Sequence, residues 1–121
     1  MNNKHEPSQK EPEIAFDDFT RVDIRIGTVL NAELNLKARN QAYVLTIDLG
    51  ALGIKKSSAQ VTQNYEAENI IDKQVVCVVN FPSKNVAGVI SEVLVLASVS
   101  ERCGTILLTA THQAPNGSRV L

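Results

Sequence analysis

The stretch from residue 74 to residue 99 limits the possible folds of this chain more than any other. A β-branched run at 74–81 is followed by a short polar loop that holds Pro82, Lys84 and Gly88, and a second apolar run begins at 86. Apolar runs of this length, bounded by loop residues, are typical of strands buried on both faces. Small β-barrels often carry their binding residues on such loops, which a rigid sheet holds in place.

Strand patterns recur along the rest of the chain. From Val22 to Leu34 apolar and polar residues alternate, which predicts a long half-buried strand with its even-numbered residues on one face. Gly27 within it predicts a bulge or a close backbone approach. The complete set of predicted strands is 22–34, 43–49 (with Leu45, Ile47 and Leu49 on one face), 54–61, 74–81, 86–99 and 105–109.

Two helices and one turn complete the predicted elements. Pro12 suits the first turn of a short helix ending near Phe19, with Ile14 and either Phe16 or Phe19 packed inward. Helical spacing within 62–71 predicts a second short helix. Asn116-Gly117 is a strong turn signal, after which residues 119–121 could pair back as an edge strand.

These elements predict an all-β protein. The best match is an OB-fold, a five-stranded barrel with a short helix between strands three and four, here with a short N-terminal helix added. An SH3-like barrel and a small sandwich also agree with the pattern. A length of 121 residues fits one domain, which we place at 12–121 after a disordered polar tail at 1–11.

Composition limits the expected cellular location and partners of the protein. No apolar run is long enough to span a membrane and no signal-peptide core is present, so we expect a cytoplasmic protein without membrane insertion. Residues 1–18 hold two lysines against five acidic residues, a net charge of −3, whereas 19–121 hold ten basic residues against eight acidic ones, a net charge of +2. A mildly basic body permits a nucleic-acid partner without requiring one.

The positions of the cysteines and histidines argue against catalysis and metal binding. Cys77 sits in an apolar run and Cys103 at a turn, so neither a disulfide nor a metal-ligand spacing is indicated. His5 lies in the tail and His112 near the C-terminal turn, away from any nucleophile or phosphate-binding loop. We therefore expect no enzyme activity, no cofactor and no metal site.

Several segments in order resemble the tRNA-binding domain family, from about Phe16 to the C-terminus. They are Asp23–Gly27, Ile54–Gln60, Gln74–Val76 and 80–94. The resemblance is greatest to the stand-alone bacterial CsaA type, described as an export-associated chaperone. Glu92 and Val93 favour that branch, because many relatives have Gly and Met there. The resemblance implies an OB-fold homodimer that binds structured tRNA and performs no reaction.

Candidate RNA-binding residues fall in two polar segments between apolar runs. Lysine ammonium groups attract phosphates, and short polar side chains can bond to phosphate, ribose or base edges. Because strand side chains alternate, only one of Lys55 and Lys56 can face a groove. The polar side chains could instead satisfy loop backbone groups, above all at Asn80. The candidate set is Lys55, Lys56, Ser57, Ser58, Gln60, Asn80, Lys84 and Ser91.

Other side chains modify this expectation. Arg25 is predicted to be exposed or paired with Asp23 or Glu92. Among five aromatics only Phe81 and Tyr65 suit base stacking, so shape and backbone charge would dominate recognition.

Two functional hypotheses remain. The first is a tRNA-binding homodimer. The second is a chaperone that binds unfolded or preprotein peptides in an apolar groove. The weak basic charge of the chain favours this second hypothesis. The apolar runs 93–99 and 106–108 exceed what a small barrel interior takes up, which predicts pairing with a second copy of the chain.

Overall fold

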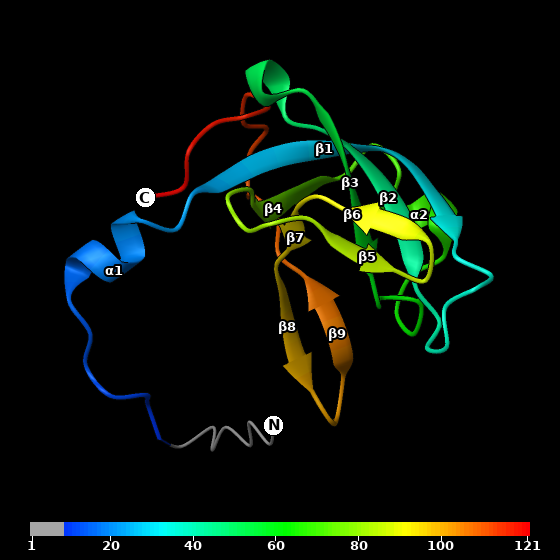
Figure 1. Ribbon diagram of the computed structural model, residues 1–121, viewed down its shortest axis with the longest axis horizontal. Coiled ribbons are helices and arrows are strands. Elements are labelled where there is room, and N and C mark those ends of the chain that lie inside the picture. The colour runs from blue at the N-terminus through cyan, green and yellow to red at the C-terminus, as the bar shows by residue number, and fades with distance from the viewer. Residues whose placement is uncertain (1–8) are drawn as a thin grey trace.

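The computed structural model describes residues 9–121, so most of the predicted tail at 1–11 lies outside the described residues. The described chain consists mainly of strands (Figure 1). Its elements are α1 (Phe16–Thr20), β1 (Ile24–Leu34), β2 (Tyr43–Asp48), η1 (Gly50–Leu52), β3 (Ile54–Ala59), α2 (Ala67–Ile70), β4 (Gln74–Val78), β5 (Lys84–Val86), β6 (Val89–Ser91), β7 (Leu94–Val95), β8 (Ala97–Ser100) and β9 (Gly104–Leu107).

Five strands form one antiparallel sheet in the order β3-β2-β1-β4-β7. The sheet curls until its two edge strands, β3 and β7, approach each other, which leaves a nearly closed barrel. The helix α2 lies between β3 and β4 in the chain and packs on β1. This topology confirms the predicted all-β OB-like barrel, rather than an SH3-like barrel or a sandwich.

The barrel is filled by a single apolar core. Leu45, Ile47 and Leu49 are fully buried in it, so their predicted shared face is confirmed. β4 contributes Val75 and Cys77 to the same core. All five residues of β4 are buried, because its other face packs against a second apolar cluster outside the barrel.

Strand β1 contributes side chains to both clusters because it contains a bulge. Its register with β2 shifts between Val29 and Asn31. Before the bulge Ile26 packs into the outer cluster, and after it Ala32 packs into the barrel. The predicted single face of even-numbered residues is therefore wrong beyond the bulge, because one extra residue exchanges the two faces. The close approach predicted at Gly27 is confirmed, since a Cβ there would lie 2.6 Å from Ile47 Cγ2.

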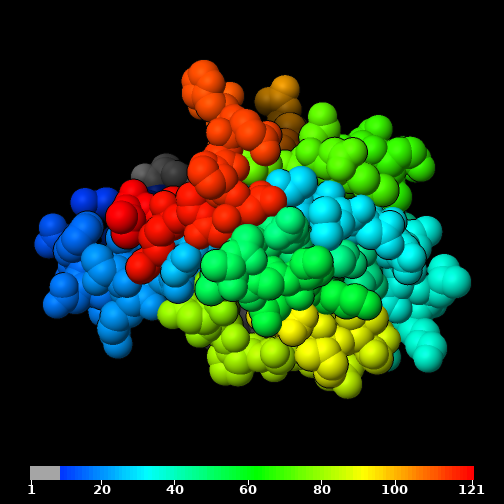
Figure 2. Space-filling view, turned by 90° about the horizontal axis from the view of Figure 1, so that it is seen from above, coloured from blue at the N-terminus to red at the C-terminus, as the bar shows by residue number. Residues whose placement is uncertain are grey.

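The outer cluster is covered by both ends of the described chain. Phe19 of α1 packs on it from one side, and residues 110–120 pack on it from the other. Figure 2 shows the red C-terminal segment lying against the blue N-terminal region. The backbone of Ile26 donates to Ser118 O at 3.0 Å and accepts from Gly117 N at 2.7 Å. The predicted turn at 116–117 is confirmed, and the edge strand after it is reduced to one bridge, Arg25–Arg119.

The N-terminal helix is shorter than predicted. It begins at Phe16 rather than near Pro12, because the Asp18 carboxylate accepts from Ala15 N at 3.1 Å and so caps the helix there. Phe19 is partly buried as predicted. Phe16 is 76% exposed, so Phe19 is the aromatic of the two that packs inward. Ile14 is 73% exposed, so its predicted inward packing is wrong.

The predicted strand at 86–99 is also wrong. Residues 84–91 instead form the β5–β6 hairpin, and residues 94–100 form β7 and then β8, which pairs with β9. The hairpin turn contains Ala87 and Gly88, with positive φ angles of 49° and 86°. Two consecutive positive φ angles define the tight turn that matches strand twist, so the chain reverses where an apolar run suggested continuity.

Candidate nucleic-acid interface

Strand β3 presents two faces of different character. Its side chains alternate, so that Lys55 and Ser57 pair with buried positions of β2, whereas Lys56 and Ser58 lie on the outer face. Ser57 is fully buried inside the barrel, and its hydroxyl has no hydrogen-bond partner there. It therefore cannot touch a ligand in this structure, and its prediction as an RNA contact is wrong. The prediction that only one of the two lysines faces the groove is confirmed, and that lysine is Lys56.

The β5–β6 hairpin lies along the free edge of β3. Ser58 N donates to Ser91 Oγ at 3.0 Å, and Lys56 N donates to the Glu92 carboxylate at 2.9 Å. Glu92 N in turn donates to Lys56 O at 2.7 Å. These bonds bring Lys84, which pairs with Ser91 across the hairpin, to the same side of the barrel as Lys56.

An open groove of about 490 Å³ separates the outer face of the sheet from the hairpin. Lys56 lies on its floor, and Glu33 and Glu92 lie beside it. The walls are formed by Val44 of β2 and residues 88–90 of the hairpin. The groove therefore combines one cation and two carboxylates with apolar walls, which is less basic than a site built on lysines alone.

A second cationic segment adjoins the hairpin and was absent from our sequence-based candidates. The β1–β2 loop places Arg39 in a cavity of about 260 Å³, together with Gln60 and residues 86–87 of the hairpin. Asn35 Nδ2 donates to Val86 O at 3.4 Å and so links the two segments. Sequence alone does not mark this loop as part of a site, because the strand pattern does not show which loops meet.

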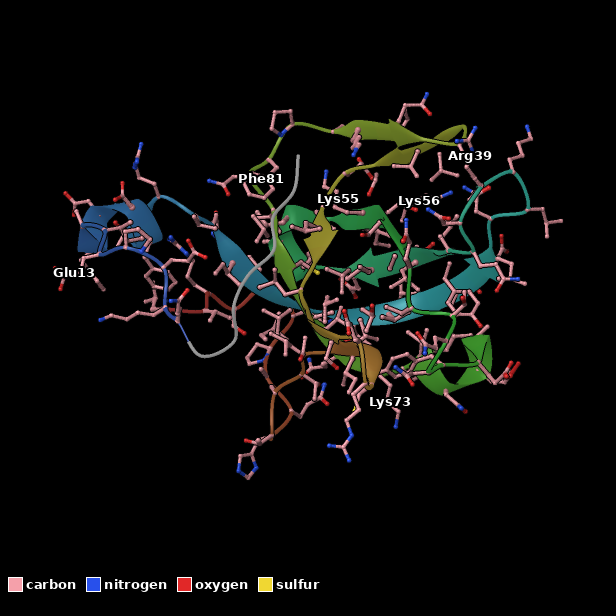
Figure 3. All side chains as sticks on the ribbon, turned by 90° about the horizontal axis from the view of Figure 1, so that it is seen from below. Glu13, Arg39, Lys55, Lys56, Lys73 and Phe81 are labelled. Carbon is pink, nitrogen blue, oxygen red and sulfur yellow. The ribbon has the colours of Figure 1, made fainter. Side chains whose placement is uncertain are left out.

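Three basic side chains, Lys55, Lys56 and Arg39, lie on one side of the molecule. Figure 3 shows Lys55, Lys56 and Arg39 on the side where the hairpin lies, with Phe81 nearby and Lys73 on the opposite side. Lys56, Lys84 and Arg39 are all exposed. They come from β3, β5 and the β1–β2 loop, so three segments distant in sequence supply one set of cations.

Two candidates use their side chains for hydrogen bonds within the protein. Asn80 Oδ1 accepts from Asp23 N at 2.9 Å, and Asn80 Nδ2 donates to Arg21 O at 2.8 Å, which confirms the structural alternative considered for this residue. The Ser91 hydroxyl accepts a hydrogen bond from Ser58 N and donates one to Val93 O. Ser58 is half-buried and Gln60 is exposed beside Arg39.

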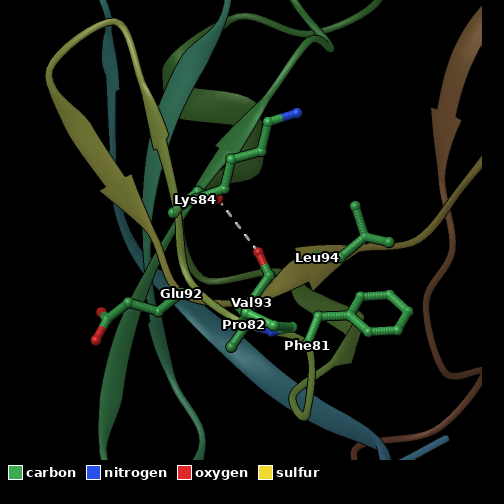
Figure 4. Close-up of a pocket in the computed structure, with 7 residues that line it drawn as sticks. Phe81, Pro82, Lys84, Glu92, Val93 and Leu94 are labelled. Carbon is green, nitrogen blue, oxygen red and sulfur yellow. Dashed lines mark hydrogen bonds between the residues drawn. The ribbon is translucent and has the colours of Figure 1, made fainter.

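An apolar cavity lies on the other side of the hairpin. It measures about 220 Å³ and is lined by Phe81, Pro82, Val93 and Leu94, with Lys84 at its rim. Figure 4 shows Phe81 and Leu94 on one side of it and the Glu92 side chain pointing the opposite way. Phe81 is 52% exposed, which makes it an accessible flat surface. Tyr65, the other aromatic considered for stacking, is half-buried and its hydroxyl accepts from Leu107 N at 2.9 Å.

Arg25 belongs to a structural ion pair. Its Nε donates to Asp23 Oδ1 at 2.6 Å, and its Nη1 donates to Gly117 O at 3.0 Å, so the predicted Asp23 partner is confirmed. Arg119 Nε lies 3.3 Å from the same carboxylate. The hydrogen bond from Arg25 and the charges of both arginines lower the pKa of Asp23 against the opposing effect of burial.

Residues 9–121 contain no group of three or more His, Cys, Asp or Glu side chains that could hold a metal ion. Cys77 and Cys103 are free thiols, and burial raises the pKa of Cys77 to about 12. No helix in this part of the chain is both long and apolar enough to cross a bilayer.

Comparison with known proteins assigns the family. The model of the putative tRNA-binding domain matches residues 24–119, so the chain belongs to the tRNA-binding domain family. It is 35% identical over 105 residues to a methionine–tRNA ligase of Methanococcoides burtonii, which covers 87% of this chain and 15% of that enzyme. The chain thus spans about one sixth of the length of the curated relatives it matches.

Two solved structures match nearly the whole chain. The chaperone CsaA of Bacillus anthracis is 48% identical, with a TM-score of 0.86 over 91% of this chain and 100% of that one. The CsaA chaperone protein of Picrophilus torridus is 38% identical, with a TM-score of 0.85 over 90% and 100%. The resemblance to the family and to its CsaA type is therefore confirmed.

Proposed function

We propose that this protein binds tRNA through the face formed by β3, the β5–β6 hairpin and the β1–β2 loop. The observation that carries the proposal is that Lys56, Lys84 and Arg39, from three separate segments, line three cavities that border the β5–β6 hairpin. Membership of the tRNA-binding domain family supports the choice of ligand. OB-folds bind oligonucleotides on the face of their second and third strands, with the loops that join strands one and two and strands four and five.

Shape and phosphate charge would dominate the recognition. The exposed cations lie on two strands and one loop, where they can follow a folded backbone, and Phe81 is an exposed aromatic suited to stacking. The carboxylates of Glu33 and Glu92 weaken the positive field between the cations. We therefore expect moderate affinity that falls steeply with salt.

Titration of bulk tRNA at several salt concentrations tests this proposal. Lys56→Gln and Lys84→Gln should each weaken binding and reduce the slope of log affinity against log salt by about one. Lys73→Gln is the matched control, because Lys73 lies on the opposite side. Binding that ignores salt, or a Lys73→Gln effect equal to that of Lys56→Gln, would reject the interface.

The protein acts without catalysis and as a homodimer. Leu94, Val99, Ile106 and Leu108 are 46%, 78%, 43% and 42% exposed around β7–β9, an apolar surface that a second copy would cover. Val99→Asp should shift the mass measured by light scattering from dimer to monomer. Leu36→Asp, a change at a side chain 90% exposed on the β1–β2 loop, should leave the dimer intact. A wild-type monomer at micromolar concentration would contradict this part of the proposal.

We place the protein in the cytoplasm because tRNA is its proposed ligand. Fractionation of cells that express the full chain, followed by immunoblotting, would check that location.

A chaperone role is the second candidate. Leu94 lines both the cavity at Phe81 and an apolar groove of about 440 Å³ beside β7–β9, and the CsaA proteins whose structures match this chain are named chaperones. Such a groove could hold extended segments of unfolded or preprotein chains. The protein should then suppress aggregation of a heat-denatured client, and Phe81→Ser should weaken that effect. Phe16→Ser, a change at an exposed aromatic on α1, is the control.

A further inference from the structure

The free edge of β3 lacks a regular strand partner on its outer side. β3 is the first strand of the barrel sheet and pairs along its length only with β2. Its outward amides at Lys56 and Ser58 would otherwise face solvent or attract another strand, the usual hazard of an edge. Both amides instead donate to side chains that follow the hairpin, namely Glu92 and Ser91.

These contacts form a reciprocal junction, which we call the Ser91–Glu92 clasp. Its three bonds are Ser58 N to Ser91 Oγ at 3.0 Å, Lys56 N to Glu92 Oε2 at 2.9 Å and Glu92 N to Lys56 O at 2.7 Å. Two of them depend on a side-chain oxygen that substitution can remove. A bond to a charged acceptor is among the stronger protein hydrogen bonds.

Lys84 lies next to this clasp in the hairpin. It pairs with Ser91 across the hairpin, one residue before Glu92. The hairpin sheet contains β5 and β6 alone, so its attachment to the barrel edge runs through β3 on this side. Together with the bond from Asn35 Nδ2 to Val86 O, the clasp holds the hairpin that carries Lys84 against the barrel.

We propose that Ser91 and Glu92 are positioning residues for RNA binding, which hold the Lys84 hairpin against the strand that carries Lys56. This inference rests on the proposed tRNA-binding function. It assigns Glu92 a role opposite to the one that its charge suggests. A carboxylate beside Lys56 repels phosphate, so electrostatics alone predicts that removing it strengthens binding.

Variants at Glu92 separate the two roles. Glu92→Gln removes the charge but keeps an oxygen that can accept from Lys56 N, whereas Glu92→Ala removes both. Positioning predicts that Glu92→Ala weakens tRNA binding and reduces the salt slope by about one, as if Lys84 were lost. It predicts that Glu92→Gln binds at least as tightly as the wild type.

Glu33 supplies the matched charge control. It lines the same groove, and its one described bond is with the exposed Asn31 side chain. Glu33→Ala and Glu33→Gln should both strengthen tRNA binding slightly, because they remove a negative charge without touching the clasp. If Glu92→Ala behaves like Glu33→Ala, the positioning role is overturned.

Amide hydrogen exchange of the full chain tests the clasp without RNA. Glu92→Ala should raise exchange at Lys56 by about tenfold or more, the effect of losing a bond to a charged acceptor, and Glu92→Gln should restore most of the protection. Ser91→Ala should raise exchange at Ser58, and Ser91→Thr should not. Unchanged exchange in both alanine variants would overturn the clasp.

The two proposals fail in different ways. A wild type that binds no tRNA at low salt rejects the proposed function and the positioning role with it, while exchange still decides whether the clasp exists. Thermal melting of each variant identifies global destabilisation. A Glu92→Ala protein that melts like the wild type and yet loses affinity supports positioning, and one whose lost affinity follows its lost stability overturns it.

Discussion

The two sides of this barrel are held by different forces. On the side of β1 and β4, which we call the covered side, the outer faces of both strands are buried beneath α1 and residues 110–120. On the side of β3, which we call the open side, a two-stranded hairpin is attached by hydrogen bonds that involve Ser91 and Glu92. The proposed ligand-binding cations lie on the open side.

This difference separates stability from binding within one small domain. Apolar burial is non-directional and contributes in proportion to area, so the covered side carries stability. Hydrogen bonds are directional and contribute modestly to stability, but they fix the spacing of the groups they join. Mutations on the covered side should therefore affect folding first, and those on the open side should affect binding first.

The largest test of this comparison uses two isoleucines. Ile26→Ala on the covered side removes a side chain that is 7% exposed and should lower the free energy of unfolding by roughly 2–5 kcal/mol. Ile90→Ala on the open side removes one that is 51% exposed and should change it by about 0.5 kcal/mol or less. Urea unfolding followed by circular dichroism measures both values. Equal losses would end the comparison.

Two glycines with nearly the same backbone angle provide a second test. Gly117 has φ 88° and Gly88 has φ 86°, so alanine at either position pays a conformational cost of roughly 1–2 kcal/mol. A Cβ at residue 117 would also lie 2.5 Å from Leu49 O, whereas one at residue 88 meets no atom within 4 Å. Gly117→Ala should therefore lower the melting temperature well beyond Gly88→Ala. A smaller shift for Gly117→Ala would show that the C-terminal segment can move away.

Acid should weaken the covered side through Asp23. Its pKa in the folded protein lies below the ordinary value of 3.8, so its stabilising contribution is complete above that value and is lost as pH falls from it through the lower folded pKa. Asp23→Asn should lower stability at pH 7 and should also lose less stability than the wild type below pH 4. Urea unfolding across that pH range checks both. Parallel pH profiles would assign acid sensitivity to other carboxylates.

The smallest effect concerns thiol reactivity and leaves stability unchanged. Cys77 is fully buried and its pKa is raised to about 12, so it should react with a disulfide reagent only after unfolding. Cys103 is exposed in the turn between β8 and β9, so it should react in the native protein. One fast thiol in wild type and none in Cys103→Ser is the expected count. A second fast thiol in native protein would show that β4 opens.

Sequence reasoning succeeded where local pattern and tertiary environment agree. The alternation in β2 marked Leu45, Ile47 and Leu49 as core because one face of that strand is buried. The continuous apolar run of β4 marked a strand buried on both faces, and the structure shows the two clusters that bury it. The Asn116-Gly117 turn was visible for the same reason, since its backbone conformation depends on those residues themselves.

It failed where a single residue changes the geometry. One extra residue at the β1 bulge exchanged the faces of the strand, and the positive φ at Ala87 and Gly88 divided an apolar run into a hairpin and later strands. At the site, Ser57 was chosen for its polarity although it points into the barrel. Arg39 was passed over because sequence does not show that its loop meets the hairpin.

The amino-acid sequence alone determined the class of this protein, its tRNA-binding domain family and most of the residues that fill the barrel, because hydrophobic periodicity and turn chemistry are local properties. Tertiary structure decided which cations lie near one another and which polar groups form hydrogen bonds within the fold. Those outcomes depend on the contact between Lys56 and Glu92 and on the meeting of the Arg39 loop with the hairpin, which the sequence does not show.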